Sequence, residues 1–124
     1  MKKACFMSKR GDIAFLSDIK EAVGRIELYI GTKSNEEFLK DIKTQDAVVR
    51  NLEIIGEATK NVSNELKRKY PQIPWKKLAG ARDRLIHYYF GVNYDVVWAI
   101  VKEELPEILP QIEEVLDREN LEEN

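Results

Sequence analysis

Residues 45–69, QDAVVRNLEIIGEATKNVSNELKRK, decide the expected fold. Their apolar side chains recur at spacings of three and four, which is the period of one face of an α-helix. We therefore predict a long helix with Thr44 as its N-cap. Gly56 lies in its middle, where glycine costs about 1 kcal/mol relative to alanine, so we expect another backbone to approach closely there. The apolar stripe consists of Val48, Leu52, Ile55, Val62 and Leu66, widened by Ala47, Ile54 and Ala58.

Upstream of this stretch, residues 11–30 form a second helical pattern. The pattern ends before Gly31, a residue type that often terminates helices because it tolerates a left-handed backbone. Ser34 and Glu37 then have the spacing of a capping box, which predicts a short helix through Leu39. The stripe of the first pattern comprises Phe15, Ile19, Val23, Ile26 and Ile30.

Downstream, prolines and glycines divide the chain. Pro71 and Pro74 end the long helix, and residues 75–78 are expected to form one helical turn. A third helical segment is predicted over residues 79–90, closed by Gly91.

The last helical pattern begins after Asn93, which is a suitable cap. Pro106 and Pro110 fall inside this pattern, so we expect a kink or a break there. No segment shows the sustained alternation that predicts strands. The expected fold is all-α, an up-down bundle of four to five helices. The stripe of the last pattern comprises Val97, Val101, Leu105, Ile108, Ile112 and Val115.

Composition limits the class of protein. The 124 residues fit one domain, which we place at 12–118, with a flexible extension at 1–11 and an acidic tail at 119–124. The single cysteine, Cys5, excludes a disulfide framework or a cysteine-based zinc site within one chain. No apolar run approaches the roughly 18 residues that span a bilayer, and none follows the first lysines as in a signal peptide. A cytoplasmic protein without membrane contact is expected.

The net charge of −2 conceals an asymmetry. Seven basic residues and one acidic residue lie between Lys67 and Arg84, whereas nine acidic residues and one basic residue lie between Glu103 and Glu123. A basic middle and an acidic end suit a protein that guides a polyanion to one surface. On charge alone, however, two solvated helix faces are the favoured interpretation.

Residues 82–89, RDRLIHYY, carry the candidate chemistry. His87 is the only histidine, and its side-chain type suits proton transfer in both directions near neutral pH. The planar guanidinium of Arg82 matches phosphate oxygens. This combination suits cleavage of a phosphodiester, and RNA needs no metal because its 2′-hydroxyl is an internal nucleophile. A lone histidine is more often structural, and Tyr88 and Tyr89 equally suit a core or an interface.

Helical geometry separates these two groups. Positions 82 and 87 are about 140° apart around an ideal helix, whereas His87 shares a face with Asp83 and Arg84. Asp83 would then orient the imidazole. Arg82 would have to reach around the helix, act from a frayed first turn, or act on a phosphate held between two copies of the segment. The last option predicts a homodimer with the site at its two-fold axis.

The pattern Arg82-x4-His87-x-Tyr89 resembles the R-x4-H-x-Y motif of the HepT-like branch of the HEPN superfamily. Two further blocks are similar to that family, RNLEIIGEA at residues 50–58 and PWKKLAGARD at residues 74–83. The resemblance extends from about Asp12 to Leu116. Three blocks in order, at compatible spacing, are much more specific than the bare motif.

The resemblance implies a HEPN-like fold and a metal-independent endoribonuclease that needs no cofactor. It implies a homodimer whose motifs line a cleft, with Arg82 and His87 at the cleavage positions. Asp83 and Arg84, which helical spacing places on the face of His87, are the candidate supporting residues. It also implies a toxin neutralised by an MNT-type nucleotidyltransferase antitoxin, which in some systems transfers AMP to the motif tyrosine, here Tyr89. Asp83 departs from the asparagine common in the family and brings negative charge close to the phosphate.

Two other functions stay open on the sequence alone. One is a non-catalytic nucleotide- or partner-binding subunit of a nucleotidyltransferase complex, and the other is a purely structural helical dimer. Arg50 and Glu57, seven residues apart, share a helix face. An ion pair that fixes packing is favoured for them over a role in positioning Arg82 or His87.

Overall fold

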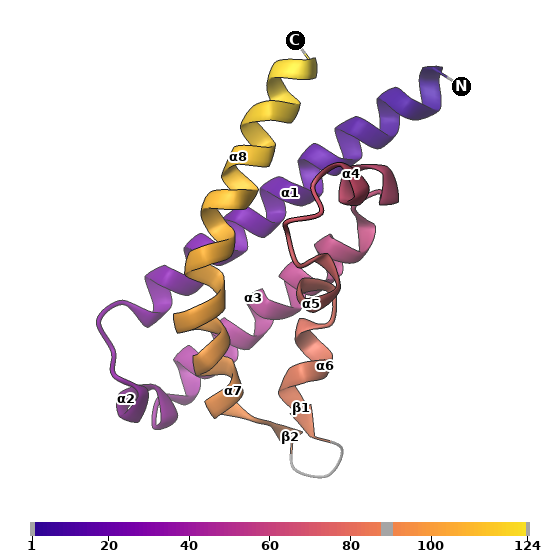
Figure 1. Cartoon of the computed structure of the whole chain (residues 1–124). Helices are drawn as coiled ribbons and strands as arrows, with labels where there is room; N and C mark the ends of the chain where they lie inside the picture. The colour runs from indigo at the N-terminus through magenta and orange to yellow at the C-terminus, as the bar shows by residue number, and fades with distance from the viewer. Residues whose placement is uncertain (1, 88–90, 124) are drawn as a thin grey trace.

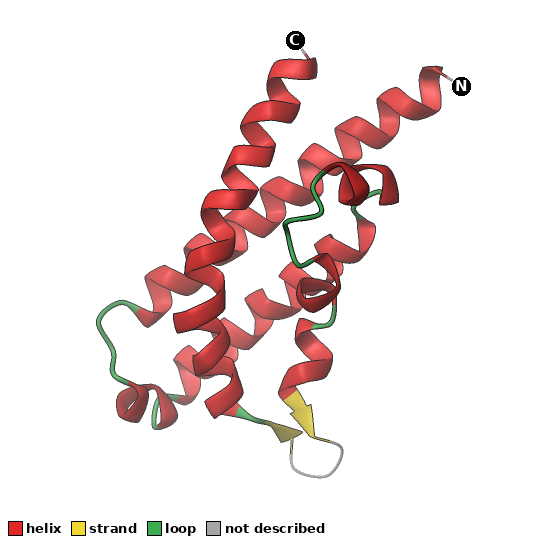
Figure 2. Ribbon diagram, in the orientation of Figure 1, coloured by secondary structure: helices red, strands yellow, loops and turns green. Residues whose placement is uncertain are grey.

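The computed structural model describes residues 2–87 and 91–123, with side chains over 11–85 and 91–122. The chain passes along the molecule four times, in alternating directions, which confirms the all-α up-down bundle (Figures 1 and 2). No helix in the described part is long and apolar enough to cross a membrane. The elements are α1 (Lys2–Ile30), α2 (Asn35–Leu39), α3 (Ile42–Asn61), α4 (Asn64–Lys69), α5 (Trp75–Ala79), α6 (Ala81–Leu85), β1 (Ile86–His87), β2 (Gly91–Val92), α7 (Tyr94–Ala99), the π-helical segment η1 (Ile100–Glu104) and α8 (Leu105–Glu123).

The first predicted helix and its end are confirmed. Gly31 has a φ of +52°, and its N–H donates to the carbonyl of Glu27. Ser34 forms the expected capping box at the start of α2. Helix α1 begins at Lys2, so residues 2–10 have helical backbone, and the flexibility expected of residues 1–11 stays a prediction.

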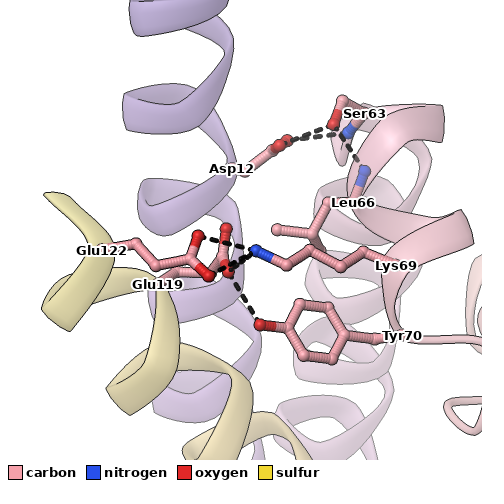
Figure 3. Close-up of polar contacts among 7 residues, drawn as sticks. All are labelled: Asp12, Ser63, Leu66, Lys69, Tyr70, Glu119 and Glu122. Carbon is pink, nitrogen blue, oxygen red and sulfur yellow. Dashed lines mark hydrogen bonds and ion pairs between the residues drawn. The ribbon is translucent and has the colours of Figure 1, made fainter.

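The long helix predicted over residues 45–69 is in fact two helices. Asp41, rather than Thr44, caps α3: its carboxylate accepts from the Thr44 N–H at 3.1 Å. Val62 then adopts an extended backbone, and the Ser63 side chain caps α4. The carboxylate of Asp12 accepts from the N–H and hydroxyl of Ser63, at 2.7 and 2.6 Å (Figure 3). The interruption is stable because α1 supplies a partner for the groups that leave the helix.

The third helix predicted over residues 79–90 is much shorter than expected. Helix α6 ends at Leu85, whose carbonyl accepts from the N–H of Asn93 at 2.7 Å. The chain then enters an antiparallel hairpin in which Ile86 pairs with Val92 and His87 pairs with Gly91. Gly91 has a φ of +74°. The prediction that the chain has no strands was therefore wrong for these four residues. The reason is that the chain turns back at Asn93, whose N–H bonds to the last residue of α6.

The predicted cap of the last helical pattern is confirmed. The Asn93 side chain accepts from the N–H groups of Asp95 and Val96. The irregularity expected at the prolines takes the form of the π-helical segment η1, in which the N–H of Leu105 donates to the carbonyl of Ile100. Pro106 follows directly and has no N–H to offer the preceding turn. The helix continues through Pro110 to Glu123.

A polar cluster fastens the end of α8 to α4 (Figure 3). The ammonium of Lys69 contacts the carboxylates of Glu119 at 2.9 Å and Glu122 at 2.6 Å. The hydroxyl of Tyr70 donates to Glu119 at 2.7 Å. Burial, together with this hydrogen bond, raises the pKa of Tyr70 to about 12. Glu119 is only 4% exposed, so part of the acidic end of the chain belongs to the packed fold.

The close approach predicted at Gly56 is confirmed. A Cβ at this position would lie 3.3 Å from the carbonyl oxygen of Ala79 and 3.6 Å from that of Leu78. Helix α5 therefore rests with its C-terminal backbone directly on α3. Because α6 follows after a single glycine, Gly80, this contact sets where α6 begins.

Replacing Gly56 with alanine tests this contact. Alanine gains about 1 kcal/mol in helix propensity, but displacing the α5 backbone costs about 1–3 kcal/mol, so Gly56→Ala should lower the free energy of unfolding. Gly24→Ala is the control, because a Cβ on this exposed residue of α1 would meet nothing within 4 Å. It should raise the unfolding free energy by about 0.5–1 kcal/mol. Denaturant titration measures the unfolding free energy of both variants. If Gly56→Ala stabilises the protein as much as Gly24→Ala does, the predicted contact is contradicted.

Candidate active site

Helix α6 presents one buried and one exposed face. Ala81 and Leu85, four residues apart, are 3% and 1% exposed, and α6 contacts α3 and α7. The three residues between them, Arg82, Asp83 and Arg84, are exposed. Because the side chains of Ala81 and Leu85 are buried, the charged residues between them face solvent.

Arg84 is held by an ion pair. Its guanidinium donates twice to the carboxylate of Glu104 in η1, at 2.8 and 2.7 Å. The ammonium of Lys77 lies 3.4 Å from the same carboxylate. The hydrogen bond from Arg84 lowers the pKa of Glu104, and the same bond raises the pKa of Arg84. Arg84 thus fastens α6 to η1, and the support that it was expected to give His87 stays a prediction.

Arg82 and Asp83 are unengaged. Among the described residues, neither side chain makes a hydrogen bond or an ion pair. An exposed guanidinium without a carboxylate partner keeps its full capacity to bind phosphate oxygens. Asp83 likewise has no partner within 11–85 and 91–122, so no described cation neutralises the negative charge that it brings to the motif. Its expected role in orienting His87 stays a prediction.

His87 lies on β1 and not on α6. The prediction that it shares a helix face with Asp83 and Arg84 is therefore wrong, because the helix ends two residues before it. Its backbone pairs with Gly91 in the hairpin that directly follows α6. The His87 side chain lies outside the described part of the structure, as do Tyr88 and the predicted modification site Tyr89.

Arg50 and Glu57 do not pair with each other. Arg50 lies 3.9 Å from Glu53, and both residues line a shallow groove between α1 and α3. Glu57 lines the same groove and has no ion pair within the described residues. Within the described residues, neither side chain makes a hydrogen bond or an ion pair with Arg82. The His87 side chain lies outside the described part, so a role in positioning it stays a prediction.

Glu104 is the residue that sequence reasoning missed. It lies in a long acidic region that composition describes only as a charged helix face. No spacing rule connects it to Arg84, twenty residues earlier, because the contact depends on how η1 packs beside α6. No group of three or more potential metal-ligating side chains occurs in the parts of the chain that the structure describes.

Comparison with known proteins identifies the class. The model of the family described as "Ribonuclease HepT-like" matches residues 19–115, which include all of α6 and the hairpin. The chain is 48% identical over 119 residues to a protein of Methanocaldococcus jannaschii described as a "Putative RNase", covering 95% of this chain and 98% of the relative. It is 49% identical over 107 residues to the "Probable ribonuclease HepT" of Thermococcus cleftensis, covering 86% and 97%.

No solved structure matches the chain significantly. The family match covers more than half of the chain, and both relatives are covered almost completely. This protein therefore belongs to the HepT-like ribonuclease family, as the three sequence blocks predicted.

Substituting Glu104 tests the anchoring of α6. Glu104→Gln should lower the free energy of unfolding at neutral pH by about 1 kcal/mol, because it removes a bidentate, partly buried ion pair. Since folding lowers the pKa of Glu104, the ion pair stabilises the fold fully at pH values above the ordinary pKa of 4.5. This contribution is lost as pH falls through the lowered folded-state value. The unfolding free energies of Glu104→Gln and the unmodified protein should therefore differ at neutral pH and converge in acid. A difference that does not change with pH would contradict the ion pair.

Proposed function

We propose that this protein is a metal-independent endoribonuclease that cleaves RNA with Arg82 and His87. The observation that carries the proposal is the guanidinium of Arg82, which is exposed on α6, has no partner among the described residues and lies a few residues before His87, in a chain of the HepT-like ribonuclease family. Arg84 is paired with Glu104, so Arg82 is the arginine of this helix that is available to a phosphate.

The chemistry requires a base, an acid and a cation. In the proposed reaction the 2′-oxygen of RNA forms a bond to the adjacent phosphorus while the bond from phosphorus to the 5′-oxygen breaks. An imidazole accepts the proton of the 2′-hydroxyl, and the departing 5′-oxygen receives a proton. The guanidinium of Arg82 stabilises the charge that gathers on the phosphoryl oxygens. The products are a 2′,3′-cyclic phosphate and a free 5′-hydroxyl.

A homodimer would complete this site. The chain has a single histidine, whereas the reaction uses one group that accepts a proton and one that donates it. Two copies of the hairpin facing each other across a two-fold axis would supply two imidazoles and two guanidinium groups. We therefore propose that the cleft between two subunits holds the scissile phosphate.

The regulatory part of the proposal rests on the family. A HepT-type toxin would act on cytoplasmic RNA and would be neutralised by an MNT-type nucleotidyltransferase antitoxin. Transfer of AMP to Tyr89, two residues after His87, would add bulk and phosphate charge beside the site. That charge would repel the RNA backbone.

RNA cleavage in the presence of a chelator tests the assignment. The purified protein, free of any partner, should cleave single-stranded RNA, and Arg82→Ala and His87→Ala should each reduce the rate by about a hundredfold or more. Arg118→Ala is the matched control, because Arg118 is an exposed arginine paired with Glu114 on α8. Its rate should equal that of the unmodified protein. Gel analysis of end-labelled RNA gives both rate and cleavage position.

Each alternative outcome has a distinct meaning. Cleavage that persists in both variants would remove Arg82 and His87 from the site. A protein that binds RNA but cleaves none would instead be the non-catalytic binding subunit. Cleavage lost on adding chelator and restored by a divalent cation would contradict the metal-independent mechanism.

A further inference from the structure

The structure divides the basic residues of segment 67–84 into two groups. Lys69 and Arg84 form ion pairs with acidic side chains of α8 and η1, and Lys77 contacts the same Glu104 carboxylate as Arg84. The remaining cations make no ion pair with any described residue; they are Lys67, Arg68, Lys76 and Arg82. Basic residues that have no structural partner are the ones available to an external anion.

Three of these free cations surround one hollow. Lys67 and Arg68 come from the last turn of α4, and Lys76 comes from α5. The hollow has a volume of about 580 Å³ and is open to solvent. Its other lining residues are Asn64, Pro71, Pro74, Trp75 and Lys77, and we call the whole feature the basic hollow.

The floor of the basic hollow is apolar. Pro71 and Pro74 form the connection between α4 and α5, and Trp75 is 8% exposed with its indole N–H donating to the carbonyl of Tyr70 at 2.9 Å. An apolar floor with cations beside it suits a ligand whose charged and apolar groups alternate. Single-stranded nucleic acid has this character, because each phosphate is followed by a sugar and a flat base.

The helices that line the basic hollow lead along the chain to the motif segment. Helices α4, α5 and α6 follow one another along one side of the molecule and lead to the hairpin (Figure 1). Helix α5, which carries Lys76, contacts α6, which carries Arg82. A strand held in the hollow would therefore be positioned to continue toward Arg82.

We propose that the basic hollow binds the backbone of the RNA substrate outside the scissile phosphate. This inference rests on the proposed ribonuclease function and adds a second binding surface to it. Lys67, Arg68 and Lys76 bind phosphates, while the prolines of the floor contact sugars or bases. The hollow thereby supplies affinity and holds the strand in register, and Arg82 acts on the phosphate that is cut.

Binding of an RNA that cannot be cut tests the hollow apart from catalysis. The probe is a fluorescent single-stranded oligonucleotide with 2′-O-methyl groups throughout, which has no nucleophile for cleavage. Its affinity is measured by anisotropy at several salt concentrations. The test variant carries Lys67→Gln, Arg68→Gln and Lys76→Gln. The matched control carries Lys33→Gln, Lys40→Gln and Lys43→Gln, which remove equal charge around α2, at another corner of the molecule (Figure 1).

The hollow variant should bind the probe at least about tenfold more weakly, and the slope of log affinity against log salt should fall by about 2, as expected for three lost phosphate contacts. The control variant should match the unmodified protein in both quantities. Circular dichroism verifies that both variants are folded.

Two results would overturn the proposal. Equal affinity and slope for both variants would remove the hollow from RNA binding, and the ribonuclease function would stand if the unmodified protein still cleaves RNA. Competition by poly-glutamate as strong as by unlabelled RNA of equal charge would assign the hollow to an acidic protein partner instead. If the unmodified protein cleaves no RNA while the hollow variant alone loses probe binding, the proposed function fails and the binding surface survives.

Discussion

The candidate site depends on the close contact between the backbone of α5 and Gly56 of α3. Helix α6 has five residues, too few for a stable helix in isolation, so its position must be imposed from outside. One constraint is the approach of the carbonyls of Leu78 and Ala79 to α3. The burial of Ala81 and Leu85 adds a second constraint. The pair between Arg84 and Glu104 adds a third, on the side facing η1.

These constraints leave the motif arginine free. Two arginines stand two positions apart on α6, with similar chemistry, and their surroundings give them different tasks. Arg84 meets a carboxylate whose pKa is lowered by the contact, and it becomes part of the fold. Arg82 meets no carboxylate within the described part of the chain and is exposed to solvent. The same division separates Lys69, bound to Glu119 and Glu122, from its neighbours Lys67 and Arg68, which pair with no acidic side chain that the structure describes.

Local rules predicted much of the fold. Glycine at Gly31, the capping box at Ser34 and the cap at Asn93 depend on residues within a few positions of each other, so the sequence alone locates them. The reason for Gly56 was also predictable, because an unfavourable glycine in a helix needs an explanation of this kind.

Contacts between distant residues account for what the sequence did not predict. The break after Val62 depends on Asp12, which lies 51 residues from Ser63. The end of α6 depends on the return of the chain at Asn93. That early end moves His87 from a helix onto a strand and removes the helical geometry from which its partners were inferred. The motif residues themselves were recognised only through their resemblance to a family, because a lone histidine near an arginine is common.

In the proposed site, one phosphate contacts both the imidazole of His87 and the guanidinium of Arg82. Because the chain has a single histidine, its ring resonances in a nuclear magnetic resonance spectrum belong to His87 without further assignment. Saturating the protein with the uncut 2′-O-methyl RNA should shift these resonances strongly, and Arg82→Ala should remove most of the shift at equal saturation. Ring resonances that stay unmoved while the RNA is bound would contradict the claim.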